Sequence, residues 1–128
     1  MAVVVLDTSV IIALRNEKDS HHGACMAALS NFEGEIFISV VTLIESMIHA
    51  LKKVGNRAEA HAAQLSSSVD RVVSLDQEIA LASARVRAKT GLRLPDSVIS
   101  ATALACKAQL WTFDAKLAKA TPGARLLA

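Results

Sequence analysis

The sequence contains few aromatic and cysteine residues, and it lacks a long uninterrupted apolar run. Three Phe, one Trp and no Tyr occur among 128 residues, so aromatic side chains make up 3% of the chain. Cys25 and Cys106 are too far apart in sequence for a closely spaced metal-binding pair, and we expect both to be reduced, buried side chains. The longest nearly apolar stretch, residues 36–51, is short for a membrane span and contains Glu45 and His49. No basic segment of a secretory signal is visible at the start. These absences predict a cytoplasmic protein with no membrane association.

Small and aliphatic side chains dominate what is present. Hydrophobic residues make up 52% of the chain, mainly Ala, Leu, Val and Ile, and 128 residues can bury a substantial core. This composition suits helices packed on a buried parallel sheet and argues against disorder. Because no internal repeat or linker interrupts the sequence, we expect a single domain spanning residues 1–128.

Short apolar runs alternate along the chain with longer segments of helical periodicity. The pattern predicts strands at residues 2–6, 36–38, 71–75 and 109–112, and an edge strand at 124–127. It predicts helices at residues 8–14, 21–29, 40–54, 77–89 and 97–108, one between 56 and 68, and a short one ending at 119. This alternation predicts an α/β fold, a three-layer α/β/α sandwich around a mostly parallel sheet of four or five strands.

Several polar residues and glycines mark the expected ends of these helices. Ser20 is a candidate N-cap for the second helix, and Asn56 forms a capping-box pattern with Glu59. Asp76 is expected to cap the helix that Gly91 then ends. These side chains are therefore assigned to helix ends rather than to chemistry.

Four carboxylates stand where an α/β fold gathers its chemistry. Asp7 ends the first strand, Asp114 follows the fourth, Asp96 opens a helix and Glu45 lies inside an apolar helix. Each has a simpler explanation, because aspartates cap helices and Glu45 could belong to a solvated stripe. Together they can meet in one crevice at the carboxyl edge of the sheet, where they would repel one another unless cations bind. Mg²⁺ or Mn²⁺ would suit such oxygen ligands, and could activate water and neutralise phosphodiester charge.

Charge is distributed unevenly between the two parts of the chain. Residues 1–78 carry six Lys/Arg and ten Asp/Glu, whereas residues 79–128 carry eight and two. The basic side chains of the second part could contact the phosphates of a nucleic acid, or they could form an ordinary solvated surface. The candidates for phosphate contact are Arg85, Arg87, Lys89, Arg93, Lys116 and Lys119.

The order and context of the four acids resemble those of PIN-domain ribonucleases, specifically the VapC-type toxins of toxin–antitoxin pairs. The matching segments, which span nearly the whole chain, are Leu6-Asp7-Thr8-Ser9, Glu45, Pro95-Asp96 and Thr112-Phe113-Asp114. The resemblance implies a PIN-like fold and endonucleolytic cleavage of RNA that depends on Mg²⁺ or Mn²⁺. It also implies that Asp7, Glu45, Asp96 and Asp114 are the catalytic, metal-binding set.

The same resemblance implies supporting residues and partners. Thr8 and Ser9 would orient Asp7, and Thr112 would bind metal or water. Phe113 departs from the pattern, since many relatives have Asn or Arg there, and this puts a polar substrate contact in doubt. The family also implies a homodimer, and inhibition by a cognate antitoxin that reaches the acidic pocket with an arginine.

Two questions stay open at the level of sequence. The alternative to an enzyme is a non-catalytic PIN-like module that binds RNA or protein, although the presence of all four acids favours catalysis. Scarce aromatic residues favour recognition of RNA by shape and backbone. The second question is whether an apolar surface belongs to the core or is covered by a partner helix or second subunit. Its residues are Leu43, Met47, Ile48 and Leu51.

Overall fold

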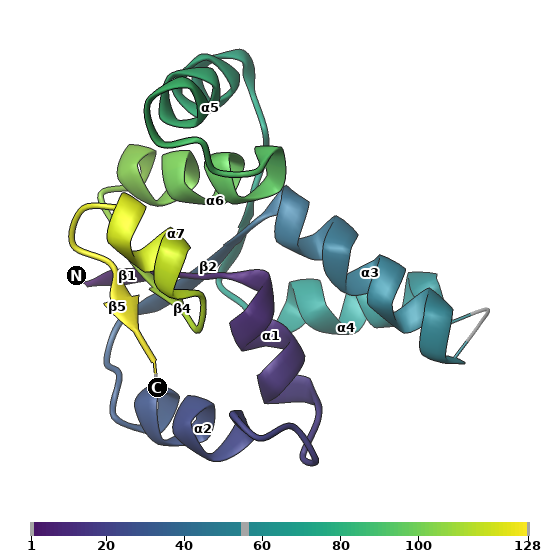
Figure 1. Ribbon diagram of the computed structural model, residues 1–128. Coiled ribbons are helices and arrows are strands. Elements are labelled where there is room, and N and C mark those ends of the chain that lie inside the picture. The colour runs from purple at the N-terminus through teal and green to yellow at the C-terminus, as the bar shows by residue number, and fades with distance from the viewer. Residues whose placement is uncertain (1, 55–56, 128) are drawn as a thin grey trace.

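The apolar run at the start of the chain forms the central strand of a five-stranded parallel sheet (Figure 1). The computed structural model describes residues 2–54 and 57–127, and its strands lie in the order β3-β2-β1-β4-β5. All four strand pairs are parallel. The strands are β1 (Val3–Leu6), β2 (Glu35–Ser39), β3 (Arg71–Val73), β4 (Gln109–Thr112) and β5 (Arg125–Leu126).

Helices cover both faces of this sheet. The described residues form α1 (Thr8–Arg15), α2 (His22–Ser30), α3 (Val40–Val54), α4 (Ala58–Ser68), α5 (Gln77–Thr90), α6 (Leu94–Ala105) and α7 (Ala115–Ala120). Helices α1, α2 and α4 pack on one face, while α6 and α7 pack on the other, with α5 against α6 (Figure 1). The fold is the predicted three-layer α/β/α sandwich.

The central strand is buried on both faces, which explains why its sequence is apolar without alternation. Val4 and Leu6 pack with the α1, α2 and α4 side, whereas Val5 packs with Ile99 of α6 and Leu117 of α7. All three strand side chains are at most 1% exposed. This arrangement fixes the carboxyl end of β1 in the middle of the sheet edge.

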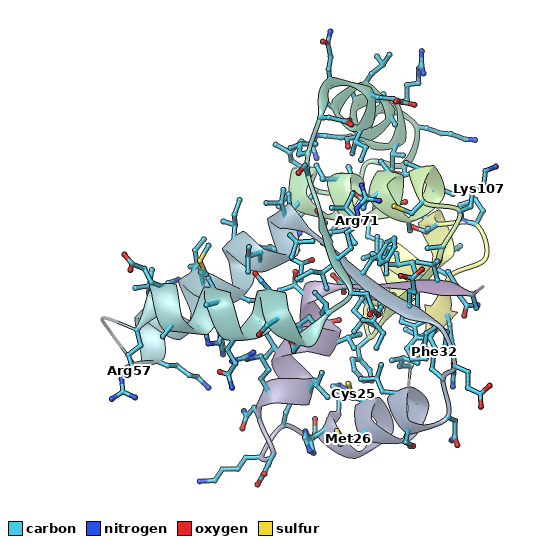
Figure 2. The ribbon with its side chains drawn as sticks, turned by 180° about the vertical axis from the view of Figure 1, so that it is seen from behind. Cys25, Met26, Phe32, Arg57, Arg71 and Lys107 are labelled. Atoms are coloured by element: carbon cyan, nitrogen blue, oxygen red, sulfur yellow. The ribbon has the colours of Figure 1, made fainter. Side chains whose placement is uncertain are left out.

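Trp111 and Cys25 both lie in the core on the α1, α2 and α4 side of the sheet, and the burial of Cys25 confirms the sequence-based prediction. Trp111 of β4 is 2% exposed and meets the ring of Phe32 edge to face, with centroids 5.3 Å apart. Cys25 of α2 is buried and has no disulfide partner among the described residues (Figure 2). Cys106 is likewise free there, but it is only partly buried.

Several element ends differ from the sequence prediction, for identifiable reasons. The third strand ends at Val73 rather than residue 75, because β2 is its sole neighbour and their register ends at the pair Ser39–Val73. Helix α6 begins at Leu94 rather than residue 97, with proline in its first turn, where a fixed φ suits the helix. It ends at Ala105 rather than residue 108, shortly before Lys107, whose φ is 53°.

Helix caps were predicted with mixed success. Asp76 caps α5 by accepting a hydrogen bond from the backbone N–H of Ile79, and Gly91 ends that helix with a φ of 71°. The prediction for Ser20 is wrong, because His21 occupies the N-cap position of α2 and makes no side-chain cap. Asn56 lies outside the described residues. Among the residues 2–54 and 57–127, no helix combines the length and apolarity needed to cross a membrane.

Candidate active site

The site lies where the order of the chain along the sheet reverses. From β1 the chain proceeds to β2 and β3 on one side, and later returns to β4 and β5 on the other. In open α/β sheets this switch point leaves a crevice outside the carboxyl ends of the strands. Leu6 pairs with Trp111, so the residues that follow them, Asp7 and Thr112, stand side by side at the crevice.

Asp7 is the most deeply buried acid of the site, with 4% of its surface exposed. Its Oδ1 accepts a hydrogen bond from the backbone N–H of Thr8 at 2.7 Å. Its Oδ2 accepts bonds from the Ser9 hydroxyl at 2.7 Å and the Thr112 hydroxyl at 2.6 Å. Three donors therefore hold this carboxylate in one orientation at the start of α1.

Glu45 is brought to the same edge by α3, which begins directly after β2. The Thr8 hydroxyl donates to Glu45 Oε1 at 2.6 Å, and it also lies 3.2 Å from the hydroxyl of buried Thr42. Thr8 therefore differs in part from its expected role. Its backbone orients Asp7, but its side chain orients Glu45.

Asp96 lies in the first turn of α6 and is only 7% exposed. Arg93 Nε donates to its Oδ2 at 3.1 Å. Burial raises the pKa of Asp96; the Arg93 guanidinium opposes this, while the negative charges of Asp7 and Asp114 raise that pKa further. The charges of Asp7 and Asp114 thus act on the Asp96 carboxyl, which indicates that the three acids belong to one site.

The Arg93 guanidinium pairs with Asp96 and lies within the influence of two further acids of the site. Its pKa is raised, chiefly by its hydrogen bond and ion pair with Asp96, and also by the charges of Glu45 and Asp114. The Arg93 side chain is 73% exposed, so the ion pair itself contributes little to folding. Sequence reasoning proposed Arg93 as a phosphate contact, and the structure pairs this side chain with an acid of the site.

Asp114 serves both as a helix cap and as part of the site. Its Oδ1 accepts hydrogen bonds from the backbone N–H groups of Lys116 at 2.9 Å and Leu117 at 3.2 Å, at the start of α7. Its own backbone N–H donates to the Thr112 hydroxyl at 2.9 Å. Thr112 thus links Asp7 to Asp114, and the cap explanation for Asp114 does not exclude a role in the site.

The donor set fits a hard divalent cation, although the side chains are not gathered into a finished metal cage. Within the described residues, no group of three or more His, Cys, Asp and Glu side chains is arranged to hold a metal ion. Yet three acids each keep one oxygen that accepts no hydrogen bond from these residues: Glu45 Oε2, Asp96 Oδ1 and Asp114 Oδ2. Oxygen donors of this kind suit Mg²⁺ or Mn²⁺.

The remaining predicted phosphate contacts lie on two helices, α5 and α7, and α7 begins directly after Asp114. Arg85, Arg87 and Lys89 are exposed on α5, and Lys116 and Lys119 are exposed on α7. The Arg87 guanidinium donates to the backbone carbonyl of Leu92 and so helps to fix the loop before α6. None of these five forms an ion pair with another described residue.

Phe113 lies beside the site without a polar contact of its side chain. Its ring stacks on His21, with centroids 4.3 Å apart and planes 22° apart. Its backbone N–H donates to the Ser9 hydroxyl at 3.2 Å. The loop between β4 and α7 is therefore tied to α1 through Ser9 and to the segment before α2 through His21.

Sequence reasoning did not assign to the site two basic residues, His49 and Lys52, that follow Glu45 on α3. A shallow pocket beside the acids is lined by Thr8, Glu45, His49 and Lys52, among others. His49 and Lys52 follow Glu45 by four and seven residues, the spacing that places side chains on one helix face. That spacing was the available signal, and it predicts a basic extension of the acidic site along α3.

Replacing Thr112 by valine tests its positioning role. Thr112→Val removes the hydroxyl between Asp7 and Asp114, so we expect Mn²⁺ affinity measured by titration calorimetry to fall about 10- to 100-fold. Thr121→Val is the matched control, because the buried Thr121 hydroxyl bonds Ser100 at 2.7 Å on another part of the chain. Both variants should lose about 1–3 kcal/mol of unfolding free energy. Equal loss of Mn²⁺ affinity in both would contradict the assignment.

Comparison with known proteins is consistent with this arrangement. The sequence model of the PIN domain family matches residues 4–121. A toxin–antitoxin complex from Klebsiella pneumoniae contains a chain 26% identical to this one, with a TM-score of 0.79 and 98% of both chains covered.

Two more distant structures show the same fold. VapC20 of Mycobacterium tuberculosis, described as a sarcin–ricin-loop-cleaving toxin, is 20% identical, with a TM-score of 0.79, covering 91% of this chain and 94% of that one. VapBC2 of Rickettsia felis, solved with a promoter DNA fragment, is 18% identical, with a TM-score of 0.74, covering 97% and 96%. A search of curated proteins gave no significant match.

Proposed function

This chain belongs to the PIN domain family, and from that premise we propose that it is a metal-dependent endoribonuclease, the toxin of a toxin–antitoxin pair. The observation that carries the proposal is that four carboxylates, from the end of β1, from α3, from the start of α6 and from the β4–α7 loop, are connected through contacts of Thr8, Thr112 and Arg93. Three of these carboxylates keep an oxygen that accepts no hydrogen bond from the described residues. The similarity to a toxin–antitoxin chain and to an RNA-cleaving toxin supports it.

In this proposal Asp7, Glu45, Asp96 and Asp114 would hold one or more Mg²⁺ or Mn²⁺ ions. The chemistry that such an ion would supply is a lower pKa of a bound water molecule and neutralisation of negative charge on the phosphodiester. The protein's own part is to hold the acids. The hydroxyls of Thr8, Ser9 and Thr112 donate to carboxylates of this set, which fixes the orientation of those carboxylates.

Arg93 supplies a positive charge to the same crevice. In the absence of substrate it neutralises Asp96. Its long and largely exposed side chain can instead turn to a substrate phosphate, which a guanidinium binds well. We therefore place Arg93 at the reacting phosphodiester rather than on the distant backbone of the RNA.

The apolar face of α3 is the surface we assign to partner binding. Ile44, Ile48 and Leu51 follow one another at intervals of four and three residues, and each is 47% exposed. Leu43 and Met47 are partly buried, and Leu43 packs against the core. Ile48 and Leu51 of the predicted surface are therefore exposed, whereas Ile44 stands in place of Leu43 and Met47. An antitoxin helix is the proposed occupant, and we also propose a homodimer.

Cleavage of RNA in the presence and absence of divalent ions tests the function. Purified protein freed of antitoxin should cut total RNA with Mg²⁺ or Mn²⁺ and should be inactive in EDTA. Restoring the ion to the EDTA-treated sample should restore cutting, which controls for denaturation. RNA binding in EDTA without any cleavage after the ion is added would support the non-catalytic alternative. Activity that persists in EDTA would contradict metal dependence.

A further inference from the structure

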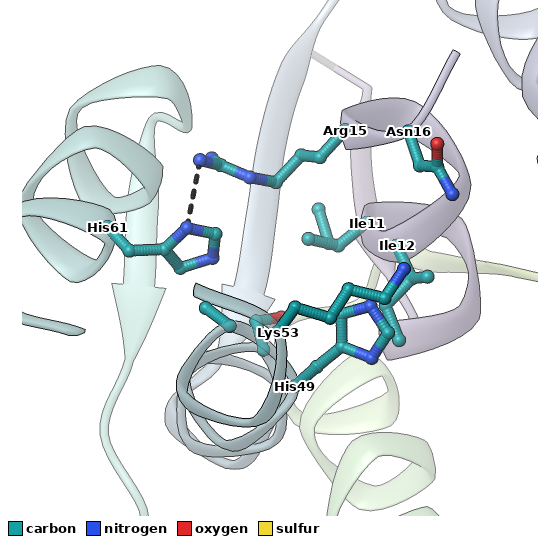
Figure 3. A pocket seen from close by; sticks show the side chains of 9 residues that line it. Ile11, Ile12, Arg15, Asn16, His49, Lys53 and His61 are labelled. Carbon is teal, nitrogen blue, oxygen red and sulfur yellow. Dashed lines mark hydrogen bonds between the residues drawn. The ribbon is translucent and has the colours of Figure 1, made fainter. Parts of the chain in front are cut away.

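A second pocket lies between α1, α3 and α4, next to the acidic site (Figure 3). Its volume is about 320 Å³. We name it the basic pocket, after the residues that line it: Arg15, Ser46, His49, Lys53 and His61, together with apolar side chains such as Ile11. Its basic residues come from the part of the chain whose net charge is negative, so overall charge gave no hint of it.

Among the residues that the structure describes, none forms an ion pair with a cation of the basic pocket. Arg15 Nη2 donates to His61 Nδ1 at 3.2 Å and to Gln64 Oε1 at 2.9 Å, and both acceptors are neutral (Figure 3). Burial, followed by the charges of Arg15 and His49, lowers the pKa of His61, which keeps it neutral and able to accept this bond. The ion pair of Arg93 with Asp96 is the only one found in residues 2–54 and 57–127. The positive charge of the pocket is therefore uncompensated within that part of the chain.

A buried hydroxyl in the wall of the pocket also lacks a partner. Ser46 is 3% exposed, and its Oγ forms no hydrogen bond within the described residues. A hydroxyl in an α-helix commonly bonds the carbonyl one turn before it, but this one does not. Leaving such a group unsatisfied costs about 1–3 kcal/mol, so a ligand that accepts its hydrogen bond would offset the cost.

The basic pocket continues the groove that begins at the acidic site. Ile12 and His49 line both the basic pocket and the pocket that contains Glu45, and His61 lines a further pocket with Arg57 and Gln64. Lys53 follows Glu45 by eight residues on α3, about 12 Å along the helix axis. That length corresponds to three or four stacked nucleotides at about 3.4 Å each.

We propose that the basic pocket binds a phosphate of the RNA strand a few nucleotides from the bond cut at the acidic site. The inference rests on the proposed function. A phosphate matches the charge of Arg15 and Lys53, and its oxygens can accept a hydrogen bond from Ser46. An acidic protein segment would match the charge as well, but continuity with the acids that face the scissile bond favours the nucleic acid strand.

Charge-removing substitutions in the basic pocket test the proposal. The probe is a synthetic RNA oligonucleotide in EDTA, followed by fluorescence anisotropy at several salt concentrations. Arg15→Gln and Lys53→Gln should each weaken binding about tenfold and reduce the salt slope by about 0.7. With metal, both should raise KM and leave kcat unchanged. Lys107→Gln is the control, because it removes a positive charge elsewhere on the molecule. Lys107 precedes β4 and lies far from the end of α3 and α4 that Arg57 marks (Figure 2).

The outcomes separate this inference from the proposed function. If wild-type protein cleaves RNA and both pocket variants bind RNA as tightly as Lys107→Gln does, the pocket assignment is overturned and the function stands. If wild-type protein neither binds nor cleaves RNA, both fail. A rise in Tm with inorganic phosphate that depends on Arg15, without any change in RNA affinity, would assign the pocket to a free or protein-borne anion and overturn the RNA assignment.

Ser46→Ala provides a second readout that folding defects cannot imitate. Removing an unsatisfied hydroxyl should leave the free energy of unfolding unchanged or raise it. The same variant should bind the RNA more weakly, because the phosphate loses a donor. Unchanged RNA affinity together with higher stability would indicate that Ser46 faces no ligand and would count against the proposal.

Discussion

Asp7→Asn is expected to reduce RNA cleavage by about a thousandfold or more. The substitution keeps the size of the side chain but removes the charge that attracts a divalent cation at the centre of the site. Stabilisation of transition-state charge by a bound ion is worth several kcal/mol, and each 1.36 kcal/mol corresponds to a tenfold change in rate. The measurement is the cleavage rate of a defined RNA at saturating Mg²⁺.

Asp76→Asn is the matched control for this prediction. Asp76 also follows a strand and also caps a helix, but it is exposed and lies at the start of α5. Because asparagine caps helices as well as aspartate does, this variant should retain both stability and activity. Full cleavage by Asp7→Asn would show that Asp7 only caps α1, and a comparable loss of cleavage in both variants would contradict a specific role of Asp7 in the chemistry.

Asp96→Asn should have two opposite effects, a large loss of cleavage and a gain in stability without metal. Burial raises the pKa of Asp96, and the charges of Asp7 and Asp114 add to this, against the pairing with Arg93. A carboxyl whose pKa is higher in the folded state is destabilising when ionised. At pH 7 in EDTA, the neutral variant should therefore unfold at a higher temperature than wild-type protein.

The pH dependence of that gain follows from the sign of the shift. In wild-type protein, the favourable contribution of protonated Asp96 is complete below its unfolded pKa, about 3.9, and is lost as pH rises through the higher folded pKa. The advantage of Asp96→Asn should thus be present at pH 7 and vanish below about pH 4. Thermal unfolding at both pH values measures it, with Asp76→Asn as the control. A lower Tm in EDTA would mean that the Arg93 pair outweighs burial.

Mg²⁺ should reverse this order of stability. An ion that binds only the folded state raises Tm, and the stabilisation grows with the logarithm of one plus the ratio of ion concentration to Kd. Wild-type protein should gain Tm as Mg²⁺ is added, and Asp96→Asn should gain less. Equal gains would exclude Asp96 as a metal ligand while leaving its electrostatic role intact.

The arrangement of strands and helices could be predicted largely from local sequence. The apolar run before Asp7 indicated a central strand, and the segment from Asp76 to Gly91 indicated a helix with both of its ends. These signals act between residues that are close in sequence. Ends set by a neighbouring strand were missed, as at Val73, because the length of β3 depends on where β2 ends.

The chemical character of the site was also readable from the sequence, but its bonding was not. Strand ends, a helix start and an apolar helix pointed to the four acids, and their oxygen chemistry predicted hard cations. The Arg93–Asp96 pair spans three residues at a helix start, so its spacing could have suggested it. By contrast, the Thr8–Glu45 bond spans 37 residues and the Thr112–Asp7 bond spans 105.

Local sequence was enough to show which side chains carry charge, which segments are apolar enough to be buried and which carboxylates follow the strands. The pairing of each hydroxyl with its carboxylate, and the meeting of Arg15, Lys53 and His61 in one pocket, became visible in the folded chain alone. The physical reason is that periodicity and capping act over a few residues, whereas these contacts depend on how α1, α3 and α4 pack around the end of the sheet.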